Sequence, residues 1–339
     1  MDSDPYLPIE NPHPIVPAVS TYDKLLTMIP PKVSVVVVNY NQGRYLRSAV
    51  DSILGQAFND FEVILVDDGS RDGSIEIIQD LVAKHPGKLQ FHCHPNHQNL
   101  GISRTYALGI SKTQSPCIAF LEADDRWGRN YLGSKVALLD QYPEAGVAFS
   151  RYKVVSRGLY GLDMAVRQHI LGLSMPRGIP FDNLKNLMQK NNVATFSAFV
   201  VRKSLLDQIS LTLPADILYF DWWILFQLAM RSKFVLDRST FIHWRQYPAS
   251  ALGSKKLEQH KSLLCRFMQV MYEEIGWRIG QLSEPNKNAY LRNRSILPEL
   301  ISFYQHPDVR RFLAFFRYSP VWALNSLASY CVNHWKYSR

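Results

Sequence analysis

The stretch CIAFLEADDRW, residues 117–127, joins an apolar run to a group of carboxylates. The apolar run at its start is typical of a strand that is buried on both faces. Three acids, Glu122, Asp124 and Asp125, then follow within four residues, and we call them the acid cluster. Like charges at the end of a buried strand repel one another, and their burial costs desolvation energy. Unless the stretch is a solvated turn, it predicts a positive partner, either a divalent cation or a basic side chain.

The residues before this stretch alternate between strand and helix patterns. Apolar, β-branched or aromatic runs predict further strands at 33–38, 61–66 and 89–94, and apolar residues at helical spacing predict helices at 45–54, 75–82 and 99–111. This alternation predicts a parallel α/β sheet with right-handed crossovers. Ligands of such sheets bind beyond the carboxyl ends of the strands. We therefore expect Tyr40, Asp67, Asp68 and the acid cluster, which follow three of the strands, to converge on one site.

Composition narrows the class of protein. The chain has 339 residues, of which 47% are hydrophobic and 20% charged, as in an ordinary globular protein. The net charge of +9 suits an anionic ligand, an anionic membrane surface or a nucleic acid, but no nucleic-acid recognition motif is present. Four scattered cysteines, no signal-peptide pattern and no long apolar run predict a cytoplasmic protein, with the inner face of a membrane as the alternative location.

Two other kinds of site can be weighed directly. The first strand-to-helix turn has no Gly-x-Gly-x-x-Gly, and the chain has no Gly-x-x-x-x-Gly-Lys-Ser/Thr, so neither phosphate-binding loop is predicted. His92, Cys93, His94 and His97 could suggest zinc. Because neighbouring residues of a strand point to opposite faces, and the spacing fits no familiar zinc pattern, we expect these four side chains to pack instead.

Four motifs in order resemble family 2 glycosyltransferases with the GT-A fold. They are Val33–Asn41, the Val66–Ser70 turn, Asn99–Gly101 and Phe120–Asp125, and the resemblance covers roughly residues 32–250. It implies an inverting enzyme that moves a sugar from a nucleoside diphosphate sugar, with a UDP-sugar expected, to an acceptor hydroxyl with the help of Mg²⁺ or Mn²⁺. The acceptor would be a glycan, a lipid-linked sugar or a protein, in polysaccharide, glycolipid or cell-envelope glycan synthesis.

The same resemblance implies the nucleotide site. Val38, Tyr40, Asp67 and Asp68 would surround the base, with Tyr40 against the uracil and Asp68 hydrogen-bonded to its edge, while Asp67 supports the turn. Arg104 lies where a basic residue often faces the diphosphate. The Arg that the family commonly has two positions later is Tyr106 here.

The resemblance also implies the reacting groups. Asp125 would ligate the metal, and Asp124 would reach either the ribose or the metal. Asp221 would be the catalytic base, although an Asp at the start of a helix is also an ordinary cap. Contacts to the diphosphate or the acceptor would come from three further residues: Glu122, where Asp is more usual, Arg245 and Trp222.

The chain is expected to have three parts. Residues 1–31, which include seven prolines, are predicted to form an arm. Residues 32–250 are predicted to form the glycosyltransferase domain, with a nucleotide half at 32–127 and an acceptor half at 128–250. Residues 251–339 are predicted to form a helical extension. Residues 151–190 are expected to be rich in loops. Residues 255–339 hold 13 Lys or Arg against 6 Asp or Glu. The extension could therefore contact a membrane surface, or it could cap the catalytic domain with its basic face in water.

Two other functions stay open on the sequence. A nucleotidyltransferase would use a related sheet, but it usually has a Gly-rich basic loop after the first strand, and that loop is missing. A non-catalytic nucleotide-sugar-binding or scaffold protein is kept open by the departures at Tyr106, Phe220 and Tyr247 from the residues usual in the family.

Overall fold

A computed structural model describes most of residues 30–305. The described residues are 30–155, 175–176, 178–188, 191, 193, 195–212, 219–245 and 257–305, with 308, 310, 312, 313 and 316. Of the predicted arm at 1–31, only Pro30 and Pro31 are among the described residues. All of the chain beyond 316 lies outside the described residues.

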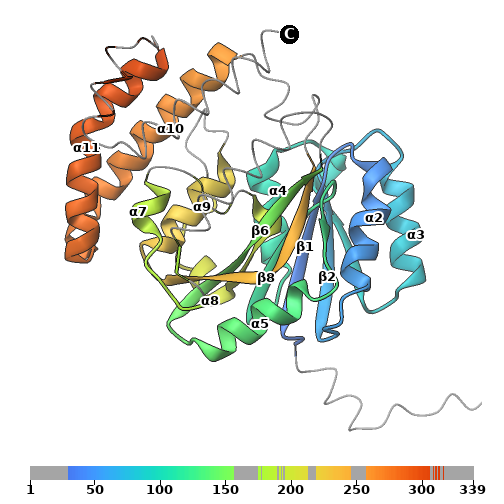
Figure 1. The fold of residues 1–339 in the computed structure, drawn as a ribbon. Coiled ribbons are helices and arrows are strands. Elements are labelled where there is room, and N and C mark those ends of the chain that lie inside the picture. Colours follow the sequence, from blue (N-terminus) through green and yellow to red (C-terminus); the bar gives the residue numbers. More distant parts are fainter. Residues whose placement is uncertain are drawn as a thin grey trace, which may run out of the picture.

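One mixed sheet organises the described residues (Figure 1). Its order is β3-β2-β1-β4-β7-β6-β8-β5, and its first four strands are parallel: β1 (Val33–Asn39), β2 (Phe61–Asp67), β3 (Leu89–Cys93) and β4 (Cys117–Glu122). The crossovers between them are α2 (Gly43–Leu54), α3 (Ser74–Lys84) and α4 (Ile102–Ser111), with a short 3-10 turn, η1 (Pro95–His97), before α4. The predicted α/β, GT-A-type architecture is confirmed, and the wholly buried centres of β1 and β4 explain why their sequences read as continuous apolar runs.

The second half of the sheet mixes directions. Its strands are β5 (Arg126–Trp127), β6 (Ala145–Val155), β7 (Phe199–Arg202) and β8 (Lys233–Arg245). β7 is antiparallel to both β4 and β6, whereas β6 and β8 are parallel. The helices are α5 (Tyr131–Gln141), α7 (Leu184–Leu187), α8 (Lys203–Leu206) and α9 (Phe220–Ala229), with a 3-10 turn, η2 (Phe196–Ala198), before β7.

One expectation for this half needs correction, and one turn beside β4 was not predicted. β7 begins at Phe199, directly after η2. The preceding turn lies over the end of β4, where the Ser197 hydroxyl accepts a hydrogen bond from the Glu122 N–H. Residues 151–155 are strand rather than loop, because β8 pairs with them; only one side of this extension is covered, so the apolar pattern weakens there.

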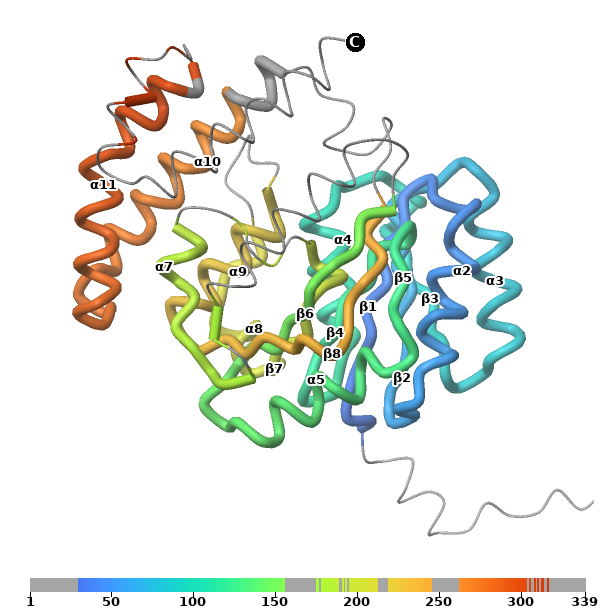
Figure 2. The backbone as a smooth tube through the Cα atoms, in the orientation of Figure 1, coloured from blue at the N-terminus to red at the C-terminus, as the bar shows by residue number. Residues whose placement is uncertain are grey.

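The long strand β8 bends back toward the end of β4. β5 begins only four residues after Glu122, yet it stands at the edge of the sheet and pairs with the last part of β8. A register shift in the β6–β8 ladder between Ser150 and Arg151 marks the bend, which Figure 2 follows along the tube. The bend brings Arg245, 120 residues away in the chain, next to Asp125.

A buried ion pair holds the bend against α5. Lys135 is wholly buried and its Nζ lies 2.7 Å from Oδ2 of Asp237. The Ser134 hydroxyl donates to the same oxygen, at 2.7 Å. Burial alone would raise the pKa of Asp237, but the charge of Lys135 and the hydrogen bonds from Lys135, Ser239 and Thr240 hold it well below its usual range. The pair is therefore ionised and satisfied inside the protein.

The C-terminal helices pack on the second half of the described fold. α10 (Leu257–Trp277) and α11 (Glu284–Gln305), joined through η3 (Ile279–Gln281), lie beside α7 and α9 (Figure 1). The Tyr272 hydroxyl donates to the Met188 carbonyl at 3.0 Å, and the Asn286 amide donates to Asp182 at 2.6 Å. Over these residues the extension is a cap, as one of the two alternatives predicts. None of the described helices combines the length and the apolar character needed to cross a membrane.

Replacement of Lys135 by Ala is expected to lower the free energy of unfolding by about 3–5 kcal/mol, because it leaves the Asp237 charge buried without its partner. Lys203→Ala is the matched control, since Lys203 pairs with Asp207 near the surface and such pairs contribute less than about 1 kcal/mol. Urea unfolding of both variants measures the difference. Equal losses would show that the buried pair does not hold β8 in place.

Candidate active site

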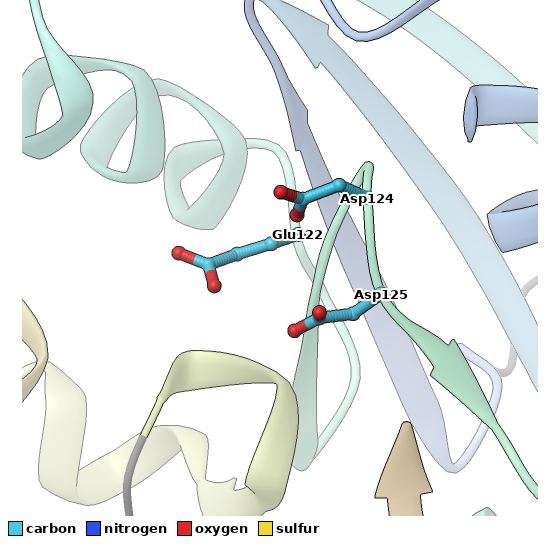
Figure 3. Close-up of side chains that lie close together, drawn as sticks. All are labelled: Glu122, Asp124 and Asp125. Carbon is cyan, nitrogen blue, oxygen red and sulfur yellow. The ribbon is translucent and has the colours of Figure 1, made fainter. Parts of the chain in front are cut away.

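The acid cluster lies at the carboxyl end of β4 (Figure 3). Glu122 ends the strand, while Asp124 and Asp125 lie in the turn that leads to β5. One carboxylate oxygen from each of the three can be chosen so that all lie within 4.8 Å of one another. The turn is fixed by two backbone hydrogen bonds, from Ala123 N–H to the Val38 carbonyl and from Asp125 N–H to the Glu122 carbonyl.

Asp125 is the most deeply buried member of the cluster, with 1% of its surface exposed. Its Oδ1 accepts the Arg245 N–H at 2.9 Å, whereas its Oδ2 is buried and has no hydrogen-bond partner among the described residues. Burial raises the pKa of Asp125 well above its usual value, and the charges of Asp124 and Glu122 add to the effect. The free oxygen and the crowded charge both point to a missing positive partner.

Glu122 forms hydrogen bonds with two residues of the second half of the fold. Its Oε2 accepts a hydrogen bond of 2.6 Å from the Thr195 hydroxyl, and its backbone N–H donates to Ser197. Burial and the Asp124 charge raise the pKa of Glu122 to about 8. Sequence reasoning missed Thr195 and Ser197, because single hydroxyls more than 70 residues away carry no motif that would link them to the cluster.

The cluster fits a divalent metal ion. Three carboxylates supply the hard oxygen ligands that Mg²⁺ and Mn²⁺ prefer, and Oδ2 of Asp125 has no other partner in the described part of the chain. A cation there would offset the repulsion that raises the pKa values of Glu122 and Asp125.

Arg245 supplies a basic neighbour as well. Besides its N–H bond to Asp125, its Nε donates to the Asp124 carbonyl at 3.0 Å, and its guanidinium lies 4.2 Å from the centre of the Tyr45 ring. The Arg44 guanidinium lies 4.4 Å from the same ring. The structure therefore places Arg245 beside the acids, with the Tyr45 ring next to it and Arg44 on the same ring, and sequence reasoning found only Arg245.

Asp67 holds the turn after β2. Its carboxylate accepts hydrogen bonds from the Asn39 side-chain amide at 2.7 Å and from both the N–H and the hydroxyl of Ser70, at 2.8 and 2.6 Å. Because these donors come from the ends of both β1 and β2, Asp67 ties the two strands together, in line with the supporting role expected for it. This geometry gives no separate support to the predicted contact between Asp67 and the base.

Asp68 joins the turn to the loop before α4. Its two carboxylate oxygens accept the N–H groups of Leu100 and Gly101, at 2.8 and 3.1 Å, and only 4% of its surface is exposed. Gly69 has a φ of +77°, and a Cβ there would lie 2.6 Å from the His97 carbonyl oxygen. The turn and the loop are thus packed as one unit, and a hydrogen bond from a base to Asp68 stays a prediction.

The other residues expected around the nucleotide differ in exposure. Tyr40 is 48% exposed at the end of β1, Val38 is half-buried, and Arg104 is exposed in the first turn of α4. Tyr106 is wholly buried, and its ring stacks on Phe196 with centroids 4.1 Å apart. Because Tyr106 is part of the core, the place of the family's second arginine offers no cation here.

Asp221 lies in the first turn of α9. Its Oδ1 accepts the Trp222 N–H at 2.7 Å, and its Oδ2 accepts the side-chain amide of Asn191 at 3.1 Å. Burial raises the pKa of Asp221 to about 6. Its charge is also among those that raise the pKa of Glu122. The N-cap position is Tyr219, so Asp221 serves the helix start only through one amide.

Trp222 is buried between three helices. Only 7% of its surface is exposed, its indole N–H donates to the Leu187 carbonyl at 2.7 Å, and its ring lies 4.8 Å from that of Phe267 in α10. Because α7, α9 and α10 close around the ring, the structure gives no support to its predicted contact with the diphosphate or the acceptor.

The four residues that could suggest zinc have other surroundings. His94 Nε2 lies 3.1 Å from the Thr105 hydroxyl and 3.7 Å from Asp68, so His94 belongs to the loop network beside the turn. The Cys93 sulfur and the His97 Nε2 are 4.0 Å apart. Within the described ranges, the grouping of three or more His, Cys, Asp or Glu with metal-binding geometry is the acid cluster.

The chain belongs to glycosyl transferase family 2, whose family model matches residues 34–210. An uncharacterized glycosyltransferase of Nostoc sp. is 36% identical over 117 residues, which cover 34% of this chain and 35% of that protein. An uncharacterized protein of Mycobacterium tuberculosis is 27% identical over 230 residues, which cover 67% of this chain and 62% of that protein. The match thus spans between about a third and three fifths of these relatives' own length.

Solved structures share the fold. The mannosyltransferase PcManGT from Pyrobaculum calidifontis, in complex with GDP-Man and Mn²⁺, is 16% identical, with a TM-score of 0.58 over 91% of this chain and 88% of that chain. S. aureus TarS in complex with UDP-GlcNAc is also 16% identical, with a TM-score of 0.56 over 86% of this chain and 80% of that chain. At this identity the likeness concerns the fold alone.

Asp125→Asn is expected to separate charge from shape. The Asn keeps an oxygen for the Arg245 N–H but cannot carry the charge that burial and the two neighbouring acids disfavour, so in metal-free buffer its melting temperature should exceed that of the wild type. Mn²⁺ at about a hundred times its Kd should stabilise the wild type by about 2.7 kcal/mol, and the variant far less. Calorimetry with and without Mn²⁺ measures both effects. Asp140→Asn, an exposed acid, is the control, and equal Mn²⁺ stabilisation of all three proteins would refute the site.

Proposed function

We propose that the protein transfers a sugar from a nucleoside diphosphate sugar, with UDP as the expected nucleotide, to an acceptor hydroxyl with inversion at the anomeric carbon. The observation that carries the proposal is the buried, unpartnered Oδ2 of Asp125 within three converging carboxylates at the end of β4. Family membership supports it, and so do the nucleotide sugars bound by the two structural neighbours. Because one neighbour holds UDP-GlcNAc and the other GDP-Man, the identity of the base rests on the resemblance alone.

Each acid has a separate task in this proposal. Asp125 and Asp124 hold Mg²⁺ or Mn²⁺, and Glu122 completes the negative pocket. The bound ion would act as a Lewis acid that offsets the charge on the departing diphosphate. Arg245, fixed by its bonds to Asp125 and Asp124, adds positive charge at the same place. Arg104, exposed in the first turn of α4, would contact the diphosphate, as the resemblance implies.

Asp221 acts as the base. As the acceptor oxygen attacks the anomeric carbon, the proton of its hydroxyl passes to the Asp221 carboxylate, and the bond from that carbon to the diphosphate oxygen breaks. A single displacement of this kind inverts the anomeric configuration. A pKa of about 6 suits the task, because the carboxylate is ionised at neutral pH and is still a stronger base than an ordinary Asp.

The domain organisation belongs to the same proposal. Residues 32–127 would bind the nucleotide and 128–250 the acceptor, with 251–339 as a helical extension. Three features support this division: the convergence of β1, β2 and β4 at the turn of Asp67 and Asp68, the place of Asp221 in the second half, and the packing of α10 and α11 on that half.

A panel of UDP- and GDP-sugars tests the donor class. Metal-dependent release of the nucleoside diphosphate, followed by chromatography with Mn²⁺ or EDTA, is expected for a UDP-sugar. Consumption of a nucleoside triphosphate with release of pyrophosphate would instead identify a nucleotidyltransferase. Metal-dependent nucleotide binding with no turnover for any donor and acceptor would identify a binding protein, and either result would overturn the proposal.

The pH profile tests Asp221. Since the base must be deprotonated, kcat/KM should rise with pH up to a plateau, with its midpoint at about pH 6. Asp221→Asn should lose about 10²–10⁴-fold in kcat while its melting temperature stays close to that of the wild type. Asn191→Ala removes a donor that favours the ionised form, so its midpoint should move to higher pH. Full activity in Asp221→Asn would exclude this role, and so would an acid limb that is unchanged in Asn191→Ala.

A further inference from the structure

The ladder formed by β5, β8 and β6 presents a row of cations on one side. Paired residues of a ladder point to the same face. Arg151 pairs with Phe241, Lys153 pairs with His243, and His243 also pairs with Arg126. These five side chains, which we call the cationic face, therefore share one side of the ladder, at the ends of the strands that Figure 2 shows beside one another.

The two sides of the ladder differ sharply in exposure. Trp127 and Ile242 point to the opposite side and are 4% and 0% exposed, so that side faces the core. Arg126, Arg151 and Lys153 are exposed. The cationic face is therefore the solvent side of the ladder.

The charge of this face is not neutralised locally. Residues 126–127, 151–155 and 241–245 contain no Asp or Glu. Over the described ranges, no carboxylate forms an ion pair with Arg126, Arg151 or Lys153. Burial lowers the pKa of His243, and the charges of Arg126 and Lys153 lower it further, as expected where positive groups gather. Such a surface attracts an anion.

Aromatic rings lie between the cations. The Lys153 Nζ stands 3.5 Å from the centre of the Phe241 ring, and the rings of Phe241 and His243 meet edge to face with centroids 5.2 Å apart. Arg151 and Lys153 are two residues apart on one strand, a spacing of about 7 Å. Rings offer a surface for the apolar faces of sugars, and spaced cations offer partners for charges repeated along a chain.

The cationic face adjoins the proposed reaction centre. β5 begins at the residue after Asp125, and β8 ends at Arg245, whose N–H binds Asp125. We propose that this face binds the acceptor, and that the acceptor is a water-soluble glycan chain carrying phosphate or carboxylate groups. This inference rests on the proposed function, because it supposes that an acceptor is bound near the acid cluster.

A membrane surface fits the cationic face less well. Peripheral membrane binding combines basic residues with apolar side chains that enter the lipid. Among the described residues, the cationic face has one large apolar side chain of notable exposure beside it, Val155 at 39%, whereas Trp277, at 82%, is exposed at the end of α10. A glycan with repeated negative charges therefore matches this face better than lipid does.

Binding of labelled dextran sulfate, with neutral dextran of the same length as the control polymer, tests the face on the full chain. Arg151→Gln with Lys153→Gln should weaken dextran sulfate binding about fivefold in fluorescence anisotropy, whereas neutral dextran should bind weakly to every variant. The matched control is Arg292→Gln with Arg294→Gln, which removes two exposed cations from α11 and should change the affinity by less than about twofold. Melting temperatures of both double variants check that they fold.

Equal weakening by the two double variants would show that only net charge matters, and would overturn the proposal. Pelleting with phosphatidylglycerol vesicles that depends on Arg151 and Lys153, without a matching effect on dextran sulfate, would assign the face to a membrane and also overturn it. Metal-dependent release of nucleotide from nucleotide sugars, measured on the same variants, separates the two proposals. If the wild type releases no nucleotide, the proposed function is refuted. Selective polymer binding would still establish that the cationic face binds an anionic ligand.

Discussion

Mutual repulsion among Glu122, Asp124 and Asp125 is the constraint on which the site depends. Three carboxylates lie close together at the end of a buried strand, where water cannot screen them well. The protein offsets part of this cost with the Thr195 hydroxyl and the Arg245 N–H, and it leaves one Asp125 oxygen without a partner. Such a site favours the binding of a cation, because the bound positive charge relieves the repulsion among the three acids.

The partial compensation also explains the shape of the second half. The Arg245 N–H can reach Asp125 only because β8 bends back and pairs with the two-residue strand β5. The ion pair between Lys135 and Asp237 stabilises this bend, because it joins α5 to β8, the strand that carries Arg245. The interior thus holds two groups of charges. The Lys135–Asp237 pair is neutralised and supports the bend, whereas the acid cluster lacks a positive partner and could bind one.

The turn after β2 follows a different principle, in which the hydrogen bonds of polar side chains fix the backbone. Asp67 joins β1 to β2 through Asn39 and Ser70, and Asp68 holds the loop at Leu100 and Gly101. Such buried, hydrogen-bonded carboxylates make a rigid platform, because removal of either would leave several donors without partners. Tyr40, in contrast, stands exposed on this platform, where a planar ligand could stack.

The sequence by itself determined the parallel half of the sheet and the acid cluster. Runs buried on both faces, such as Val33–Asn39 and Cys117–Glu122, keep an apolar pattern that does not depend on distant contacts, and the acids that follow them are adjacent in the chain. Only the tertiary structure decided the partners of those acids: Thr195 and Arg245 come from segments 73 and 120 residues away from the acids they bind. It also decided that Trp222 is core and that Arg126, Arg151 and Lys153 share one face. The physical reason is that these relations depend on strand pairing and on the bend in β8, which bring residues together without any local pattern to announce them.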